Sequence, residues 1–266
     1  MNQNSPIRAE MPQGSNKVLD RRNLENSYSS LIRLLTEGMS VLDVGCGSGS
    51  ITADVAQRVG VNGRVVGIDF SEHLIELARK NYSSIANLSF EVANINDYKV
   101  DEPFDLVIAA RTLQWVNNPA EVVGQMVDLV KEGGMISILD YNHTKIEWQP
   151  AIPSSMQAFY DAFLLWRKDA GYDNAIADNL KHIYESLGLK SIDVIEHSEV
   201  SLPEEASFKE EIRIWSIVAE TRGKQVVRDG YISEELRLKA IEEYDQWIAE
   251  DAQLMKLYLL AIEGVK

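Results

Sequence analysis

A glycine-rich run between two apolar segments constrains the fold of this chain more than any other feature. The run from Val41 to Ser50 has the sequence VLDVGCGSGS, so an apolar segment leads into three closely spaced glycines. Glycine has no Cβ, which lets the backbone turn sharply and approach a ligand closely. Asp69 ends the next apolar segment, 20 residues after Gly49. A doubly wound sheet places a ribose-binding carboxylate at this distance, so the run predicts a nucleoside site.

The charge at this turn discriminates between cofactors. A dinucleotide site needs a small residue at the third glycine position, so that the following helix can take the pyrophosphate. Ser50 and Thr52 stand at the two possible third positions and fit poorly. Asp43, two residues before the first glycine, repels a pyrophosphate but suits an ammonium or a sulfonium cation. S-adenosylmethionine (SAM) carries both cations and no phosphate, so the spacing favours SAM over NAD.

Further signals follow along the chain in a fixed order, and together they identify a family. From about Leu31 to Tyr141 the chain resembles class I SAM-dependent methyltransferases that act on small molecules. Around the cofactor motifs it is similar to the trans-aconitate and malonyl-carrier methyltransferases. The resemblance rests on the glycine run, Asp69-Phe70, Ala93-Asn94-Ile95, the segment Phe104–Val116 and Gly133-Gly134.

The resemblance implies a set of cofactor-binding residues. Asp69 is expected to hold the ribose hydroxyls, Phe70 to pack on the adenine, and Asn94 to accept from the adenine amino group. The backbone N–H of Ile95 is expected to reach the adenine ring. Ala110 and Arg111 are expected to face the methionine part of SAM. The full predicted set is Asp43, Gly45, Cys46, Gly47, Gly49, Asp69, Phe70, Asn94, Ile95, Ala110 and Arg111.

The acceptor side is less defined by the sequence. Methyl transfer mainly requires an in-line, desolvated nucleophile, and a general base helps only if the acceptor must lose a proton. His143 and Tyr141 are the predicted candidates for such a catalytic base. Gln114, Trp115 and Tyr28 are predicted to contact the substrate. The Leu113–Trp115 turn hints at a carboxylate acceptor, although the sequence shows no arginine pair placed to hold a polyanionic acid.

Two other functions stay open at this stage. The chain could bind SAM without catalysis, as a sensor or a subunit, and an NAD-dependent oxidoreductase is a weaker alternative. A metal site is not predicted, because the fourth strand ends in Ala109-Ala110 and His73, His182 and His197 lack ligand spacing.

Alternating strand and helix signals predict an α/β fold, a Rossmann-like doubly wound sheet of seven strands. A helix is predicted over residues 16–36, ahead of the first strand, and Gly133-Gly134 is predicted to form the turn into the fifth strand. Helical insertions are expected after the fifth strand and between the sixth and seventh. The predicted parts are a loose N-terminal arm (1–16), a SAM-binding core (17–144), a first lid insertion (145–172), a return to the core (173–201), a helical lid insertion (202–253) and the last core strand (254–266).

Composition limits the partners. The net charge of −15 and the absence of a basic cluster disfavour nucleic acid as a partner. No apolar run approaches the ~20 residues that span a bilayer, so no membrane association is expected. The polar N-terminus lacks the apolar stretch of a signal peptide, and Cys46 is the single cysteine, which together indicate a cytoplasmic protein. The expected partner is a small-molecule methyl acceptor, while the oligomeric state stays unknown.

Overall fold

The computed structural model describes residues 22–266, and these residues form two compact units. The sheet unit contains residues 22–141, Ile176–His197 and Leu259–Lys266. The helical unit contains Asn142–Ala175 and Ser198–Tyr258. The predicted loose arm, residues 1–16, lies outside the described residues.

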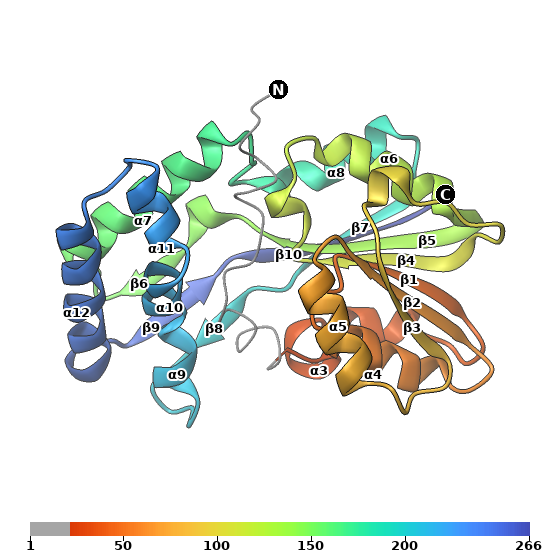
Figure 1. Cartoon of the computed structure of the whole chain (residues 1–266), viewed down its shortest axis with the longest axis horizontal. Coiled ribbons are helices and arrows are strands. Elements are labelled where there is room, and N and C mark those ends of the chain that lie inside the picture. Colours follow the sequence, from red (N-terminus) through yellow and green to blue (C-terminus); the bar gives the residue numbers. More distant parts are fainter. Residues whose placement is uncertain (1–21) are drawn as a thin grey trace. The chain divides into compact units, whose positions relative to one another are not determined.

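A seven-stranded sheet forms the framework of the sheet unit (Figure 1). Its first five strands in chain order run parallel to one another. The last strand of the chain enters antiparallel between two of the others. The strands, in order across the sheet, are β3 (Leu88–Val92), β2 (Arg64–Asp69), β1 (Ser40–Val44), β4 (Phe104–Ala110), β5 (Val130–Tyr141), β10 (Leu259–Val265) and β7 (Lys190–Glu196). The predicted Rossmann-like, seven-stranded α/β fold is therefore confirmed.

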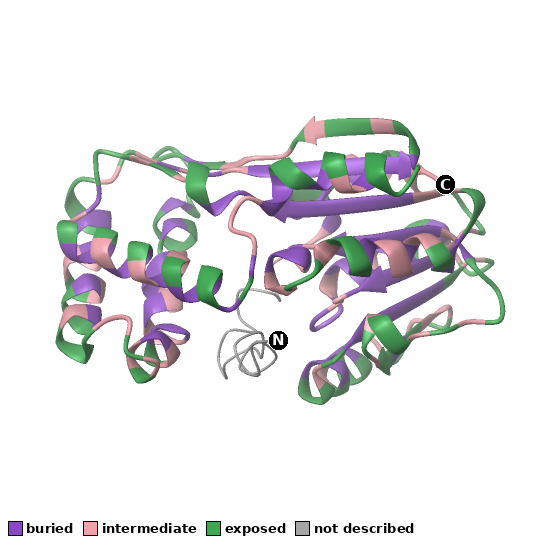
Figure 2. Cartoon of the chain, turned by 90° about the horizontal axis from the view of Figure 1, so that it is seen from above, coloured by how far each residue is buried: buried purple, intermediate pink, exposed green. Residues whose placement is uncertain are grey.

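Helices cover the two faces of this sheet. On one face, α4 (Ser50–Val59) and α5 (Glu72–Asn81) pack against β1, β2 and β3. On the other, α6 (Pro119–Leu129) and α8 (Ile176–Ser186) pack against β4, β5, β10 and β7 (Figure 1). Buried residues line the strands and the inner helix faces, whereas exposed residues lie on the outer helix faces (Figure 2). This burial on both sides explains why the central strands read as near-continuous apolar runs.

The predicted helix over residues 16–36 is wrong in its described part. The chain forms a short helix, α3 (Leu24–Ser27), and then a 3-10 helix, η1 (Ser29–Leu34). Tyr28 lies between them with φ −157°, which is extended backbone and ends the first helix. Gly133-Gly134, predicted as the turn into the fifth strand, lies inside β5 instead, with Gly133 at φ 75°.

Within the described residues the helical unit has five α-helices, and it also has a small sheet that the sequence did not predict. Helix α7 (Ser154–Asp169) packs against α12 (Glu234–Glu250) and α11 (Gly223–Arg228), and α12 also packs against α9 (Phe208–Ile212) and α10 (Ile214–Glu220). Strands β6 (Glu147–Gln149), β9 (Leu254–Leu257) and β8 (Glu199–Ser201) form an antiparallel sheet.

Two segments predicted as single strands are each divided between the two sheets. Residues 254–266, predicted as one core strand, form β9 and β10, which are separated at Tyr258. In the same way, residues 189–201, predicted as the sixth strand, contain both β7 in the large sheet and β8 in the small one. An apolar pattern indicates that a segment is a strand but not which sheet the strand joins, and this is why neither division was predicted.

No helix within residues 22–266 is both long and apolar enough to cross a membrane.

Candidate functional site

The glycine turn links the end of β1 to the start of α4 and requires glycine for two separate reasons. Gly45, Gly47 and Gly49 all have left-handed backbone angles, with φ of 73°, 57° and 85°. In addition, a Cβ on Gly45 would lie 2.4 Å from the side chain of Thr112, and one on Gly49 would lie 2.5 Å from the ring of Phe90. Backbone angle and packing together therefore exclude larger residues at 45 and 49.

Asp69 joins this turn to the next helix. One carboxylate oxygen accepts from the backbone N–H of Gly47 at 3.0 Å, and the other accepts from that of Ser71 at 2.8 Å. Burial raises the pKa of this carboxyl, and the two backbone donors oppose that rise. Asp69 is thus fixed at the carboxyl end of β2, the edge of a doubly wound sheet at which ligands bind.

Asp43 lies in β1, beside β2, and is more deeply buried. Its carboxylate accepts from the hydroxyl of Thr52, in the first turn of α4, at 2.6 Å. Burial raises the pKa of Asp43 to about 7; the bond from Thr52 lowers it and the negative charge of Asp69 raises it further. A carboxyl held in this way gains strongly from a nearby cation, because the cation offsets the cost of burying its charge.

Cys46 stands inside the turn but has no sign of nucleophilic reactivity. Burial and the nearby charges of Asp43 and Asp69 raise the pKa of its thiol well above the usual value. The thiol therefore stays protonated near neutral pH.

The predicted adenine-binding residues lie next to Asp69. Asp69 pairs with Val92 across β2 and β3, and its carbonyl accepts from the N–H of Ala93 at 3.0 Å. Asn94 follows directly and is exposed, and its side-chain oxygen accepts from the N–H of Asn96 at 3.1 Å. Ile95, half-buried, begins the 3-10 turn η2 (Ile95–Asp97), and Phe70 is 55% exposed. The exposed ring of Phe70 and the amide of Asn94 therefore belong to the segments that directly follow the ends of β2 and β3.

Arg111 follows Ala110 at the end of β4 and holds several segments together. It has φ 58°, which is unusual for a residue with a side chain. Its backbone N–H donates to the carbonyl of Leu139 at 2.6 Å, and its Nε donates to the hydroxyl of Tyr141 at 2.9 Å. A third bond, from Nη2, reaches the carbonyl of Ser27 at 3.1 Å. The guanidinium is buried in these contacts, so the side chain of Arg111 joins the N-terminal segment to the ends of β4 and β5.

The residues predicted to contact substrate are largely buried within the sheet unit. Gln114, in the 3-10 turn η3 (Leu113–Trp115), donates through its backbone N–H to Asp140 at 3.1 Å and through its side chain to the carbonyl of Arg111 at 3.0 Å. Trp115 is half-buried. Tyr28 is fully buried, with its hydroxyl 2.8 Å from that of Ser137. Packing explains the positions of Gln114 and Tyr28, and a substrate contact by these residues stays a prediction.

His143 belongs to the helical unit, two residues after β5 ends. Its ring is nearly perpendicular to those of Phe163 and Trp215, with centroids 6.4 Å and 6.2 Å away, and its carbonyl accepts from the hydroxyl of Tyr160 at 2.5 Å. Burial, and to a lesser extent the charge of Arg167, lowers the pKa of His143 well below its usual value. The imidazole is therefore neutral near pH 7.

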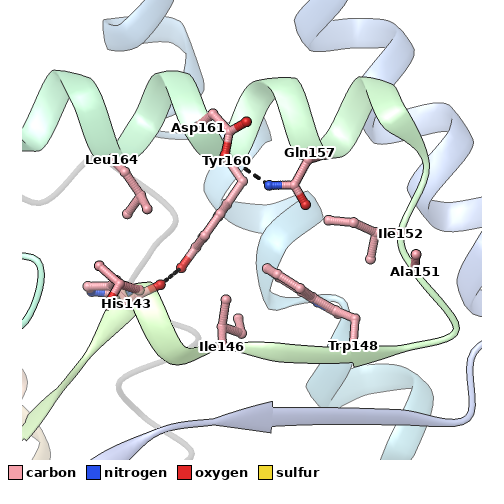
Figure 3. Close-up of a pocket in the computed structure, with 10 residues that line it drawn as sticks. His143, Ile146, Trp148, Ala151, Ile152, Gln157, Tyr160, Asp161 and Leu164 are labelled. Atoms are coloured by element: carbon pink, nitrogen blue, oxygen red, sulfur yellow. Dashed lines mark hydrogen bonds between the residues drawn. The ribbon is translucent and has the colours of Figure 1, made fainter.

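A pocket of about 430 Å³ opens beside His143 within the helical unit (Figure 3). Its apolar walls include Trp148, Tyr160 and Leu164, and its polar lining includes Gln157 and Asp161. Its volume falls in the range of small-molecule sites. No group of three or more metal-binding side chains occurs within residues 22–266.

Three residues that shape the site were not predicted from the sequence to belong to it. Thr52 donates to Asp43, Asp140 accepts from the backbone of Gln114, and Thr112 occupies the space beside Gly45, its hydroxyl 3.2 Å from the carbonyl of Val44. Thr52 lies one turn into the helix that follows the glycines, where a hydroxyl facing Asp43 could have been anticipated. Thr112 and Asp140 carry no such signal, since their partners lie 67 and 26 residues away.

Comparison with known proteins gives a consistent result. The profile of a family described as a methyltransferase domain matches residues 35–214, more than half of the chain. The chain is 34% identical to trans-aconitate 2-methyltransferase of Rhizobium rhizogenes over 104 residues, and this alignment covers 39% of each protein. It is 39% identical over 102 residues to the ubiquinone biosynthesis O-methyltransferase of Thiobacillus denitrificans, covering 37% of this chain and 43% of that one. The chain thus spans less than half the length of these curated relatives.

Solved structures share the fold. The YcgJ protein from Bacillus subtilis has a TM-score of 0.60 at 15% identity, covering 91% of this chain and 98% of that one. A phosphoethanolamine N-methyltransferase of Haemonchus contortus, in complex with phosphomonomethylethanolamine and S-adenosylhomocysteine, has a TM-score of 0.56 at 18% identity, covering 96% of this chain and 53% of that one. At these identities the likeness establishes the fold alone.

Proposed function

The chain belongs to the methyltransferase domain family, and from this premise we propose that it transfers a methyl group from SAM to a small-molecule acceptor. The proposal that the cofactor is SAM rests on one observation. Two buried carboxylates, Asp43 and Asp69, flank the glycine turn at the strand ends of β1 and β2. The bond from Thr52 holds the Asp43 carboxylate against the first turn of α4. A dinucleotide would bring its pyrophosphate to that same place and be repelled.

The residues of this site fit the parts of SAM. Asp43 would stabilise a cation of the methionine moiety, and Asp69, held by two backbone donors, keeps acceptor capacity for ribose hydroxyls. Asn94, Ile95 and the exposed ring of Phe70 would bind the adenine. The glycines at 45, 47 and 49, with Cys46 between them, and the backbone of Ala110 and Arg111 would line the remainder.

When bound, SAM supplies a methyl carbon that an acceptor lone pair attacks in line, while the carbon–sulfur bond breaks and its electron pair stays on sulfur. The contribution of the chain is to hold and desolvate the acceptor. His143 could accept a proton only from a fairly acidic acceptor, because burial makes its imidazole a weak base. The hydroxyl of Tyr141, the other proposed base, accepts a hydrogen bond from Nε of Arg111.

The segments 145–172 and 202–253, which supply most of the helical unit, are proposed to bind the acceptor and exclude water. The net charge of −15 supports a small molecule rather than nucleic acid as substrate. The single cysteine supports a reducing, cytoplasmic location.

Calorimetric titration tests the cofactor assignment. SAM and S-adenosylhomocysteine are expected to bind with micromolar affinity, roughly −8 kcal/mol, and NAD is not expected to bind. Asp69→Asn keeps the shape of the side chain but removes its charge, and is expected to weaken binding at least tenfold. Asp101→Asn is the matched control, because Asp101 is an exposed carboxylate of the same unit.

Two results would count against the proposal. Binding of NAD in place of SAM would refute the charge argument at Asp43. Tight SAM binding that Asp69→Asn leaves unchanged would place the cofactor elsewhere. Release of S-adenosylhomocysteine when an acceptor is added then separates an enzyme from a protein that only binds SAM.

A further inference from the structure

The pocket beside His143 has a polar end whose charge is negative. Among the described residues that line it, Asp161 carries the only charge, because burial lowers the pKa of His143 well below its usual value and keeps the imidazole neutral. Gln157 lies one turn before Asp161 on α7, and its side-chain amide donates to the Asp161 carboxylate at 2.9 Å. Figure 3 shows the side chain of Gln157 extending from α7 toward Trp148. A cation is therefore stabilised at this end, and an anion is repelled.

The single-proton donors among the lining side chains are already used within the protein. Tyr160 donates its hydroxyl proton to a backbone carbonyl at 2.5 Å, and Thr144 donates its own to Asn142 at 2.6 Å. Trp148 donates its indole N–H to the hydroxyl of Tyr244 at 3.2 Å. Each of these groups has one proton to donate, so it can donate to a ligand only by giving up a bond within the protein.

Acceptor atoms, in contrast, remain available at the polar end. The bond between Gln157 and Asp161 uses one carboxylate oxygen and one amide proton. Within residues 22–266 this is the only hydrogen bond of either side chain, so the second oxygen of Asp161 and the amide oxygen of Gln157 can each accept another. Two acceptors side by side suit a ligand group that donates more than one hydrogen bond, as an ammonium does.

Aromatic rings form the walls of the same pocket. Trp148 and Tyr160 pack edge to face with centroids 5.2 Å apart, and the aliphatic side chains of Ile146, Ile152 and Leu164 complete the apolar lining. The face of an aromatic ring attracts a cation, and tryptophan does so most strongly. The walls therefore suit both the charge and the apolar body of an organic amine.

A positive charge also lies on α7, but away from the polar end. Arg167 is fully buried, donates to Asn174 at 2.8 Å and does not line the pocket. Burial raises the pKa of Tyr160, Arg167 lowers it and Asp161 raises it, so both charges act on that ring. Gln157 precedes Arg167 by ten residues, which is roughly 15 Å along the helix axis. A cation beside Gln157 and Asp161 is thus much closer to the negative charge than to the positive one.

We infer that this pocket binds a protonated amine carried on an apolar body. The ammonium lies between the Asp161–Gln157 pair and the ring of Trp148. The apolar body lies against Tyr160 and Leu164. This charge is opposite to that of the carboxylate acceptor at which the sequence hints. The inference concerns binding alone, and it holds whether or not the ligand is the methyl acceptor of the proposed function.

Binding of simple amines to the whole protein, without SAM, tests the inference. The probes are benzylamine, 2-phenylethylamine and 3-phenylpropylamine, each paired with the neutral alcohol of the same carbon skeleton. These amines, like that of lysine, keep their proton at neutral pH. Calorimetry measures the affinities, and intrinsic fluorescence, to which Trp148 contributes, reports occupancy of the pocket. At least one amine is expected to bind about fivefold more tightly than its alcohol, or better. The inference is overturned if no amine binds at millimolar concentration, or if the alcohols bind as well as the amines.

Matched variants locate the charge effect. Asp161→Asn removes the charge but keeps an oxygen that accepts from Gln157, and it is expected to abolish the preference for amine over alcohol. Asp251→Asn, at an aspartate of the same unit that does not line the pocket, is expected to keep the preference. Both aspartates are exposed, so neither exchange removes a buried contact.

A second pair adds a charge at the exposed pocket residue Ala151. Ala151→Lys is expected to weaken amine binding severalfold without affecting the alcohol, because the new ammonium repels the bound one. Ala151→Gln is expected to change neither affinity.

Equal loss of amine and alcohol in Ala151→Lys, or an Asp161→Asn variant with unchanged preference, contradicts the inference. These outcomes are independent of the cofactor. A protein that binds SAM but none of the amines refutes the pocket assignment alone. One that binds the amines but not SAM refutes the proposed methyl transfer alone.

Discussion

Asp43 gives the cofactor site a dependence on pH that the structure predicts in sign and in size. Burial raises its pKa to about 7 in the ligand-free protein. Only the ionised form attracts a cation, so the apparent affinity for SAM scales with the ionised fraction. That fraction falls from about nine tenths at pH 8 to about one tenth at pH 6, which corresponds to about a tenfold weaker affinity, or about 1.4 kcal/mol.

The same pKa has the opposite consequence for stability. The unfolded chain loses the proton of Asp43 near its ordinary pKa of 3.8, whereas the folded protein keeps it up to about pH 7. The folded state therefore binds more protons within this interval, and the free energy of unfolding falls as pH rises through it. Above pH 7 the buried charge costs on the order of 4 kcal/mol, a figure that already includes the stabilising hydrogen bond from Thr52.

Asp43→Asn separates the two effects. The variant keeps an acceptor for the Thr52 hydroxyl but carries no charge. At pH 8 we expect its thermal midpoint without ligand to rise by several degrees, while its affinity for SAM falls at least tenfold and no longer changes between pH 8 and pH 6. Calorimetry at several pH values and thermal denaturation measure both quantities. A wild-type affinity that is flat over this range, or a variant that binds SAM normally, would refute the reasoning, and a pH slope retained in the variant would assign the titration to SAM itself.

Three further outcomes follow from the packing and test the site's framework. Gly49→Ala is expected to lower the free energy of unfolding by about 2–4 kcal/mol, because Gly49 has a left-handed backbone angle and an added Cβ would overlap with Phe90. Gly230→Ala, at φ 83° with open space around it, should lower it by only about 1 kcal/mol. Equal losses in denaturant titrations would show that the overlap at position 49 is relieved at no cost. Tyr28→Phe removes the buried bond to Ser137 and should cost about 1–2 kcal/mol in the same assay; if SAM affinity falls with little loss of stability, Tyr28 contacts the ligand as predicted from the sequence. Arg33→Met leaves the buried carboxylate of Glu263 without its ion-pair partner. It is expected to lower the thermal unfolding midpoint more than Arg58→Met, because the partner of Arg58, Glu25, is exposed. A loss no larger than that of Arg58→Met would show that water replaces Arg33.

Local chemistry explains which parts of the fold the sequence predicted. The glycine turn after β1 and the position of Asp69 each depend on residues within a few positions, such as the left-handed glycines. The apolar pattern of the strands then follows from burial on both faces of the sheet. The same local features therefore determine both the sheet and the candidate cofactor site.

Features that depend on distant partners were not predictable in this way. Tyr258 divides one apolar run between two sheets, because β9 pairs with β6 and β8 while β10 pairs with β5 and β7. Thr112 fills the space beside Gly45, which lies 67 residues earlier in the chain. A single sequence contains no local signal for such contacts, and the helical unit depends on many of them.

A crystal structure of the protein with S-adenosylhomocysteine bound is the most direct measurement of the central claim. We expect the ribose hydroxyls to lie within hydrogen-bonding distance of Asp69, the amino group of the ligand near Asp43, and the adenine beside Asn94 and Phe70. A ligand that lies away from the glycine turn, or one whose carboxylate rather than amino group faces Asp43, would contradict the account.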